Sequence, residues 1–148
     1  MPPEIEYRAY RDENDLELVT RLVDSELSEP YSIFTYRYFM HQWPQLCILA
    51  TVPAGEGGVQ GEERCVGAIV CKSAFHEAGS RRLRAYRGYG GTVSGTMRGY
   101  IAMLVVDKPC RKAGVGSSLL RRAVKTMHEE GCEEVRETHV RTHERMKE

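Results

Sequence analysis

The chain has 148 residues, of which 21 are basic, 21 are acidic and 41% are hydrophobic. A chain of this length can build one hydrophobic core without disulfides or a structural metal, so we expect a single domain over residues 1–148. Zero net charge gives no general reason to expect DNA or an anionic membrane as a partner. Without a signal-peptide pattern or an apolar run of about 18 residues, the cytoplasm is the expected compartment.

The first predicted elements are a strand and a helix. Apolar and polar residues alternate over residues 5–9, which is the period of a half-buried strand. Apolar residues then recur three and four positions apart from Leu16 to Leu27, which predicts a helix that begins near Asp15. Asp12 or Asn14 can serve as its N-cap.

A second helix and two strands follow. Ser32 can cap a helix that carries aromatic residues and ends before Pro44. Tyr36, Tyr38 and Trp43 are predicted to pack from this helix. Apolar runs predict buried strands over residues 46–52 and 65–72, separated by a solvated loop over residues 54–63.

The last third begins with residues that lack usable periodicity. Residues 73–98 are predicted to be a long loop with room for a hairpin. A continuous apolar strand over residues 100–106, a helix over residues 119–127 that closes on Gly131, and a strand over residues 135–140 complete the order. Strand, two helices, three strands, helix and strand indicate an α/β fold with a sheet of mixed direction.

Most of the five cysteines are predicted to be small core residues. Their number is odd and no two form a C-x-x-C pair, which argues against disulfides and a zinc ribbon. They are Cys47, Cys65, Cys71, Cys110 and Cys132. His139 and His143 have helical spacing but lack further ligands nearby, so we expect no metal site.

The most informative short pattern lies between a predicted strand and a predicted helix. Arg111-x-x-Gly114-x-Gly116 places glycines where the backbone can approach a ligand closely, and a helix N-terminus offers unpaired N–H groups to a phosphate. The pattern lacks the Lys-Ser/Thr of a Walker loop and the third glycine of a dinucleotide fingerprint. A glycine turn that only admits the helix remains an alternative reading of the same residues.

The loop spacing resembles the acyl-coenzyme A loop of GNAT acetyltransferases, in which Arg or Gln is followed by two residues, Gly, one residue, and Gly or Ala. Three longer segments resemble the catalytic subunits of NatC-type N-terminal acetyltransferases. They are Leu27–Phe39 with the following Gln42-Trp43-Pro44, Val66–Lys72, and Arg98–Val106. The resemblance covers most of residues 5–138, and its first segment is far more specific than the glycine loop.

The resemblance implies a GNAT fold with a mixed sheet flanked by helices, and transfer of acetyl from acetyl-CoA to the α-amine of peptides that begin with Met and a bulky apolar residue. It implies a peptide-binding wall at Glu29, Pro30 and Tyr31, and catalytic roles for Glu29 and Glu137. Glu137 matches the family pattern only if one residue is deleted from its strand. The implied acetyl-CoA-binding residues are Met103, Leu104, Val105, Val106, Arg111, Lys112, Ala113, Gly114, Val115, Gly116 and Ser117.

The same resemblance implies partners: nascent peptide N-termini, two auxiliary subunits and, through them, the ribosome. The sequence departs from the family in what look like loop insertions at residues 54–64 and 74–97, and near its end. We expect the family's C-terminal helix and final strands, with a general-acid tyrosine, to be missing after about Thr138. An inactive acetyl-CoA-binding fragment is therefore an alternative function.

A third function of another class comes from the basic, aromatic residues 81–91. Four arginines alternate there with two tyrosines and several glycines. Arginines and tyrosines can bind single-stranded RNA by phosphate contact and base stacking. A solvated linker has the same composition.

Overall fold

The computed structural model describes residues 4–27, 31–53, 62–77 and 95–137. These residues form five strands and three α-helices, joined in part by short 3-10 turns. In chain order the elements are β1 (Glu6–Ala9), α1 (Glu13–Glu26), α2 (Ile33–Gln42), η1 (Pro44–Leu46), β2 (Cys47–Val52), β3 (Arg64–Glu77), β4 (Gly95–Val106), η3 (Lys108–Cys110), α4 (Val115–Glu129) and β5 (Cys132–Glu137).

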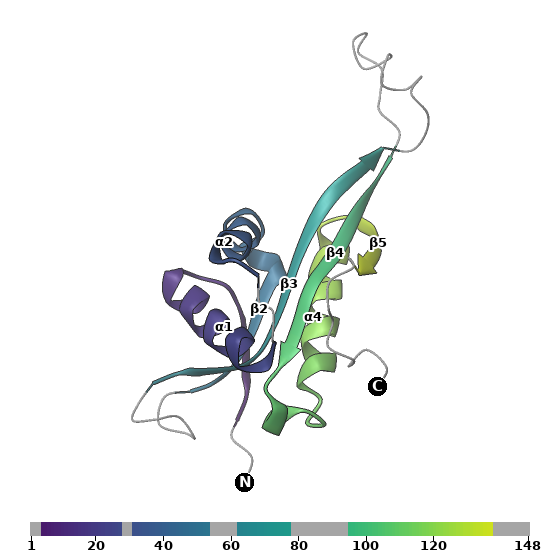
Figure 1. The fold of residues 1–148 in the computed structure, drawn as a ribbon. Coiled ribbons are helices and arrows are strands. Elements are labelled where there is room, and N and C mark those ends of the chain that lie inside the picture. The colour runs from purple at the N-terminus through teal and green to yellow at the C-terminus, as the bar shows by residue number, and fades with distance from the viewer. Residues whose placement is uncertain (1–3, 28–30, 54–61, 78–94, 138–148) are drawn as a thin grey trace.

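The five strands form one sheet in which spatial order follows chain order, from β1 to β5. Neighbours from β1 to β4 are antiparallel, whereas β5 runs parallel to β4. Helices α1 and α2 cover one face and α4 covers the other, as Figure 1 shows. The predicted α/β class, the mixed sheet and the order of elements are confirmed.

Each face of the sheet carries its own hydrophobic cluster. Leu16, Val19 and Met40 from α1 and α2 pack on one face, and Leu119 and Met127 from α4 pack on the other. All six residues of β2 are buried because both sets of its alternating side chains face a helical layer. This burial explains why its sequence is a continuous apolar run.

The helix boundaries follow the local signals that the sequence carries. The Asp12 side chain accepts hydrogen bonds from the backbone N–H groups of Asn14 and Asp15, so Asp12 is the N-cap and α1 begins at Glu13. Ser32 occupies the N-cap position of α2, and α2 ends at Gln42, just before Pro44. Both predicted helices are confirmed, with α1 starting two residues earlier than expected.

Both ends of the predicted loop over residues 73–98 are strands, and they pair as the hairpin for which the prediction left room. Strand β3 continues to Glu77 and β4 begins at Gly95, so the two strands form a long antiparallel arm that extends beyond the helices (Figure 1). Side chains on this arm leave the two cores, and the apolar alternation that identifies a strand fades while the cross-strand pairing persists. Residues 78–94 lie outside the described part of the chain.

The last strand begins earlier than expected. Strand β5 covers Cys132–Glu137 rather than starting at Val135, and residues 138–140 lie outside the described chain. Gly131 has φ +95° and provides the left-handed turn after α4 that its sequence position predicts. The parallel pairing of β5 with β4 places β5 beside Met97–Ile101, in the strand that precedes the glycine loop.

The prediction that most of the cysteines are core residues is confirmed. All five thiols are free. Cys47, Cys65, Cys71 and Cys132 are buried, and Cys110 in η3 is half-buried. Among the described residues no group of His, Cys, Asp or Glu could hold a metal ion, and His139 and His143 lie outside them.

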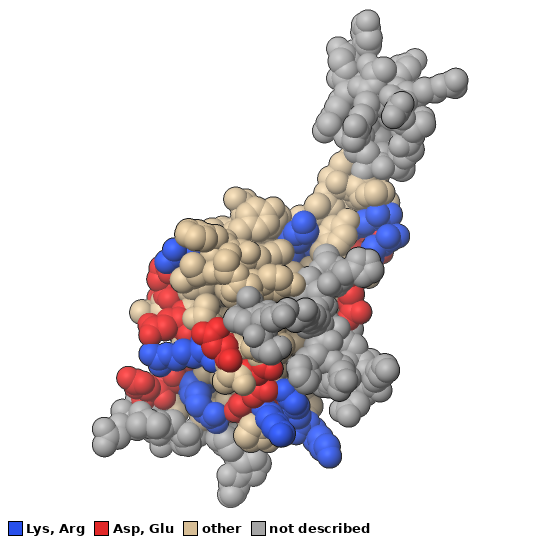
Figure 2. Space-filling model, in the orientation of Figure 1, with Lys and Arg blue, Asp and Glu red and all other residues tan. Residues whose placement is uncertain are grey.

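The surface of the described chain has a charged part and an uncharged part. Figure 2 shows acidic and basic side chains mixed over the lower part of the molecule, and a surface free of charged groups over much of α2. Three large hydrophobic side chains of α2 are exposed: Ile33, Phe34 and Tyr38. No helix within the described ranges is both long and apolar enough to cross a bilayer.

Candidate acetyl-CoA and peptide site

The carboxyl-terminal end of β4 has one edge without a strand partner among the described residues. Strand β5 pairs with β4 only from Met97 to Ile101. The Asp107 N–H donates to the Val66 carbonyl on the β3 side, at 2.8 Å. Because backbone groups alternate along a strand, Met103 and Val105 point toward β3, whereas Leu104 and Val106 point toward the open edge.

Of the four β4 residues predicted to contact acetyl-CoA, residues 103–106, only two have backbone groups on the open edge. The backbone groups of Leu104 and Val106 can reach a ligand beside β4. Met103 and Val105 use theirs in the sheet, and their side chains are buried in the cluster under α1 and α2. The open edge offers hydrogen-bonding groups of a kind that a thioester or an amide chain can pair with.

The glycine loop leads from this edge to the start of α4. Lys112 has φ +71° and Gly114 has φ +80°, so two left-handed residues turn the chain before α4 begins at Val115. The Ser118 N–H donates to the carbonyl of the N-cap residue Gly114 at 3.0 Å. The N–H groups of Val115, Gly116 and Ser117 therefore lack intrahelical partners, at the positive end of the helix dipole.

The glycines leave space at the helix start. A Cβ at Gly114 would meet nothing within 4 Å, and one at Gly116 would meet only Val106, at 3.6 Å. Gly67 on β3 is different, since a Cβ there would lie 2.9 Å from Val115 and 3.1 Å from Leu119. Gly67 thus lets α4 approach the sheet, and the other two leave open space beside the unpaired N–H groups at the start of α4, a place that we call the cradle.

Arg111 is not a free cation at this cradle. Its Nε donates to the Val106 carbonyl at 3.2 Å, and its Nη2 lies 2.6 Å from Glu26 Oε2 at the end of α1. Lys112, the next residue, is exposed. Arg111 and Lys112 are both predicted to supply positive charge to the loop. Lys112 is available to an anion, whereas Arg111 joins the loop to β4 and α1.

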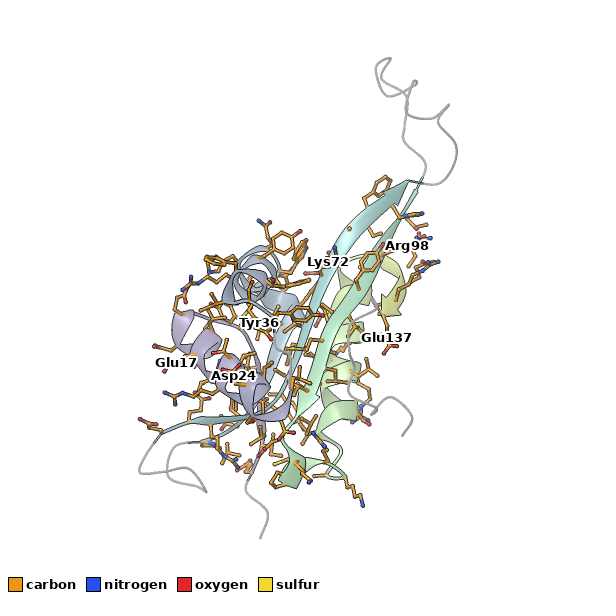
Figure 3. The ribbon with its side chains drawn as sticks, in the orientation of Figure 1. Glu17, Asp24, Tyr36, Lys72, Arg98 and Glu137 are labelled. Atoms are coloured by element: carbon orange, nitrogen blue, oxygen red, sulfur yellow. The ribbon has the colours of Figure 1, made fainter. Side chains whose placement is uncertain are left out.

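On the peptide side, Glu29 and Pro30 lie outside the described residues, and Tyr31 is 39% exposed. The Tyr31 N–H donates to the Tyr36 hydroxyl at 3.2 Å, and the two rings meet edge to face with centroids 6.1 Å apart. Burial raises the pKa of Tyr36, whose side chain points from α2 toward the sheet (Figure 3). Tyr36 therefore packs as predicted and also holds the backbone of Tyr31.

Glu137 lies at the end of β5 and is exposed (Figure 3). It stands opposite Ile101 in a parallel register, and the Ile101 side chain belongs to the cluster under α4. Neighbours in register point to the same face of a sheet, so Glu137 is on the α4 face. Tyr31, which contacts Tyr36, is on the other face, so the structure does not bring Tyr31 and Glu137 together on one face.

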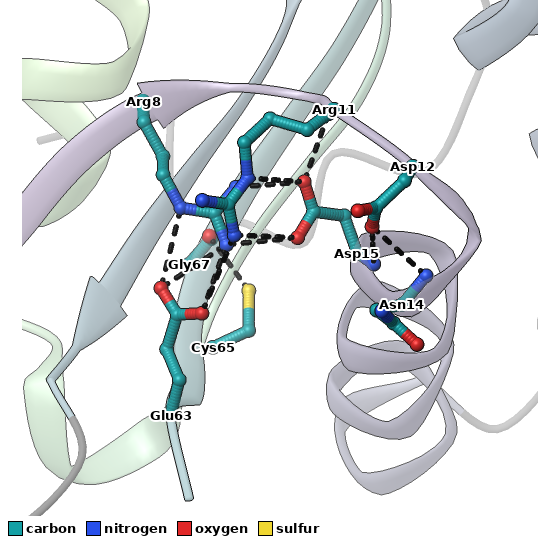
Figure 4. Close-up of polar contacts among 8 residues, drawn as sticks. All are labelled: Arg8, Arg11, Asp12, Asn14, Asp15, Glu63, Cys65 and Gly67. Atoms are coloured by element: carbon teal, nitrogen blue, oxygen red, sulfur yellow. Dashed lines mark hydrogen bonds and ion pairs between the residues drawn. The ribbon is translucent and has the colours of Figure 1, made fainter.

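A buried ion-pair network beside α1 escaped the sequence analysis. Asp15 is fully buried and accepts hydrogen bonds from Arg8 at 2.7 and 2.8 Å and from the Arg11 N–H at 2.8 Å (Figure 4). Glu63 accepts from Arg8 at 3.0 Å on the other side. The one sequence signal is an acidic residue within the apolar face of a predicted helix.

The chain matches known acetyltransferases in sequence. Residues 16–146 match the model of the acetyltransferase (GNAT) family. The chain is 50% identical over 132 residues to the Arabidopsis thaliana protein named N-alpha-acetyltransferase MAK3, across 89% of this chain and 56% of that protein. It is 45% identical over 131 residues to human N-alpha-acetyltransferase 30, across 88% of this chain and 29% of that protein.

Among solved structures, the chain resembles one described as the NatC complex bound to Gag peptide and CoA. The TM-score is 0.69 and the identity 33%, over 89% of this chain and 72% of the matched chain. The chain spans little more than half of the Arabidopsis protein and under a third of the human one. The expectation that the family's C-terminal helix and final strands are missing after about Thr138 falls on residues outside the described part, and it stays a prediction. The family match, the sheet topology and the loop at the start of α4 agree, and the chain belongs to the GNAT acetyltransferase family.

Proposed function

We propose that residues 1–148 form the acetyl-transfer domain of a NatC-type N-terminal acetyltransferase. The reaction is transfer of acetyl from acetyl-CoA to the α-amine of a peptide that begins with Met and a bulky apolar residue. The observation that carries the proposal is 50% identity, over 89% of this chain, to a protein named as an N-alpha-acetyltransferase. The likeness to the NatC complex bound to peptide and CoA points to the same reaction.

The cradle at the start of α4 supports acetyl-CoA as the acetyl donor. The N–H groups of Val115, Gly116 and Ser117 would bind the diphosphate, and the exposed Lys112 would add a positive charge. The backbone groups of Leu104 and the N–H group of Val106, whose carbonyl accepts from Arg111, would bind the pantetheine amides and the thioester. These donors are fixed by the sheet and the helix, so they need little reorganisation when charge develops on the thioester oxygen.

The chemical step asks little of the side chains. An α-amine has a pKa of about 7.7–8.0, so one proton must leave before the nitrogen attacks the thioester carbonyl. The new C–N bond forms, the C–S bond breaks, and CoA leaves as a thiolate. The amide nitrogen loses its second proton, and the thiolate takes up a proton to give the CoA thiol. Glu29 and Glu137 are the proposed proton acceptors, with Glu29 and Tyr31 also in the peptide wall. Glu137 lies on the α4 face, away from Tyr31, so of the two proposed acceptors we favour Glu29, which precedes Tyr31 by two residues in the sequence.

We also propose the partners that such an enzyme needs. Peptide N-termini are the substrates, and auxiliary subunits would bring the enzyme to nascent chains at the ribosome in the cytoplasm. The exposed aromatic side chains of α2 support a protein partner on that side of the molecule. The basic, aromatic residues 81–91 lie outside the described chain, so the RNA-binding alternative stays a prediction.

The test follows two readouts on the same sample. The chain is incubated with acetyl-CoA and a peptide that begins Met-Leu, and acetylation is followed by mass spectrometry beside a peptide that begins Ser-Leu. Thermal unfolding is recorded with and without acetyl-CoA. Acetylation of the Met-Leu peptide alone supports the proposal. Stabilisation without acetylation favours the inactive fragment. If the chain shows neither acetylation nor stabilisation, the proposal that it binds acetyl-CoA is overturned.

A further inference from the structure

The first turn of α4 rests on three residues that lie side by side across the sheet. Ala50 of β2 is paired with Gly67 of β3, and Gly67 is paired with Val106 of β4. Ala50 and Val106 belong to the cluster under α4, and a Cβ built at Gly67 would meet Val115 and Leu119 of that helix. The middle position of this row therefore has no side chain, at the place where α4 begins beside the end of β4 (Figure 1).

The contacts above Gly67 leave no room for a methyl group. A Cβ there would lie 2.9 Å from Val115 Cγ1 and 3.1 Å from Leu119 Cδ1, and both of these side chains are buried. A valine in a helix has one strongly preferred rotamer, so the Val115 side chain cannot turn away. An added methyl group would instead push the first turn of α4 away from the sheet, by about half an ångström.

Both halves of the proposed acetyl-CoA site meet at this row. The Val106 N–H faces the open edge of β4, where pantetheine is proposed to bind. The Val106 side chain lies under the cradle, since a Cβ at Gly116 would be 3.6 Å from Val106 Cγ2. Val115, which packs over Gly67, carries the first unpaired N–H group of the cradle. The packing of Val115 on Gly67 thus connects the helix donors to the strand donors.

A ligand that uses both halves needs them at a fixed separation. CoA carries its diphosphate and its pantetheine arm in one molecule, so the cradle and the open edge act as two linked binding sites. The affinity gained from such linkage depends on geometry that lets both sites be filled at once. Donors that are fixed in a helix and in a sheet cannot adjust one by one to a ligand of the wrong span.

We propose that Gly67 is a positioning residue that sets the distance between the cradle and the open edge of β4. This inference rests on the proposed function. Gly67 does not touch the ligand, and it acts by letting Val115 pack directly on the sheet. The absence of a side chain at this position therefore matches the span of the site to the span of CoA.

The first test compares Gly67→Ala with the native chain. We expect the dissociation constant of CoA and the KM of acetyl-CoA each to rise about tenfold, because the two halves no longer fit one ligand. Pantetheine reaches only the open edge and ADP reaches only the cradle. The dissociation constants of these two fragments should stay unchanged, because each half keeps its own donors. Isothermal titration measures CoA, and NMR titration measures the weaker fragments.

The matched control is Gly99→Ala, the same change on the same face of the sheet. Gly99 lies under the other end of α4, where a Cβ would overlap the Met127 sulfur. This variant should lose stability as Gly67→Ala does, and its dissociation constant for CoA should stay unchanged. Circular dichroism and urea unfolding give the folded fraction of each variant, and every dissociation constant is corrected for it.

A second pair of variants tests whether Gly67 acts through Val115. Val115→Ala removes the Cγ1 atom that the new methyl group would meet, and leaves the end of the flexible Leu119 side chain as its nearest neighbour on α4. In the Val115→Ala background, Gly67→Ala should therefore raise the dissociation constant of CoA less than twofold. If Gly67→Ala alone does not fold, this comparison carries the test, because the double variant has room for the methyl group.

Four results would overturn the inference. CoA binding in folded Gly67→Ala that is as tight as in the native chain would show that the separation does not matter. Equal losses for ADP and CoA would place the effect inside the cradle. A loss of the same size in Gly99→Ala, or a tenfold loss that persists in the Val115→Ala background, would make the role of Gly67 structural. Failure of the native chain to bind CoA is a different result, because it overturns the proposed function itself.

Discussion

Asp15 shows how one buried charge is kept ionised. Burial raises the pKa of its carboxyl, but hydrogen bonds from Arg8 and Arg11 outweigh burial and lower the pKa from 3.8 to about 2. Its ionised form thus stabilises the fold by about 2 kcal/mol. Because the pKa is lower in the folded state, this contribution is complete above about pH 4 and disappears as the pH falls toward 2.

We expect Asp15→Asn to lower the free energy of unfolding by about 3 kcal/mol at pH 7, because Arg8 then keeps a half-buried charge with one partner fewer. The difference from the native chain should narrow as the pH falls from 4 toward 2. Urea unfolding at several pH values measures it. Asp24→Asn, on the exposed side of α1, is the control. A difference that does not change with pH would contradict the account of Asp15.

At the scale of elements, the start of α4 is where a left-handed turn and a ligand cradle coincide. Gly114→Ala puts a Cβ at φ +80° in open space, so its cost is backbone strain alone, about 1 kcal/mol. Gly131→Ala places the same strain at φ +95° after the far end of α4. We expect both changes to lower stability equally, and only Gly114→Ala to weaken CoA binding.

Isothermal titration with CoA and urea unfolding give the two quantities. Equal CoA affinity in the Gly114 and Gly131 variants would mean that the turn at Gly114 positions nothing for the ligand. A Gly114→Ala variant that is far less stable than Gly131→Ala would point to a lost contact rather than to strain.

The elements also show what could be predicted from the sequence. Periodicity and capping residues identify α1 and α2 because those signals are local, and β2 is identified by its apolar run. The arm of β3 and β4 is predicted only as a loop with room for a hairpin, because its pairing depends on the partner strand rather than on its own alternation. Arg111 was predicted as a loop cation, but its partner Glu26 is 85 residues away and no local pattern connects them.

At the scale of the whole molecule, one sheet separates two cores. Met40 of α2 is fully buried in the cluster on one face, and Met127 of α4 is fully buried in the cluster on the other. Both clusters rest on the same strands, so we expect the described elements to unfold as one cooperative unit. Trp43, the single tryptophan, packs against the cluster under α4, and its ring also lies beside Tyr38 and Phe39 of α2.

Met40→Ala and Met127→Ala should each lower the free energy of unfolding by about 3 kcal/mol. In both variants the urea transition seen by Trp43 fluorescence should coincide with that seen by far-ultraviolet circular dichroism. A fluorescence transition that stays at the native midpoint in Met40→Ala would show that the two cores unfold separately.

The burial of the cysteines has a practical consequence for following the reaction. Burial raises the pKa of the Cys47 and Cys65 thiols to about 12 and that of Cys71 well above its ordinary value. The thiolate is the form that attacks a disulfide dye, so these three side chains react slowly in the folded protein. Each acetyl transfer would release one CoA thiol into solution. A chromogenic thiol reagent could therefore count turnovers continuously, with the half-buried Cys110 as the main protein background.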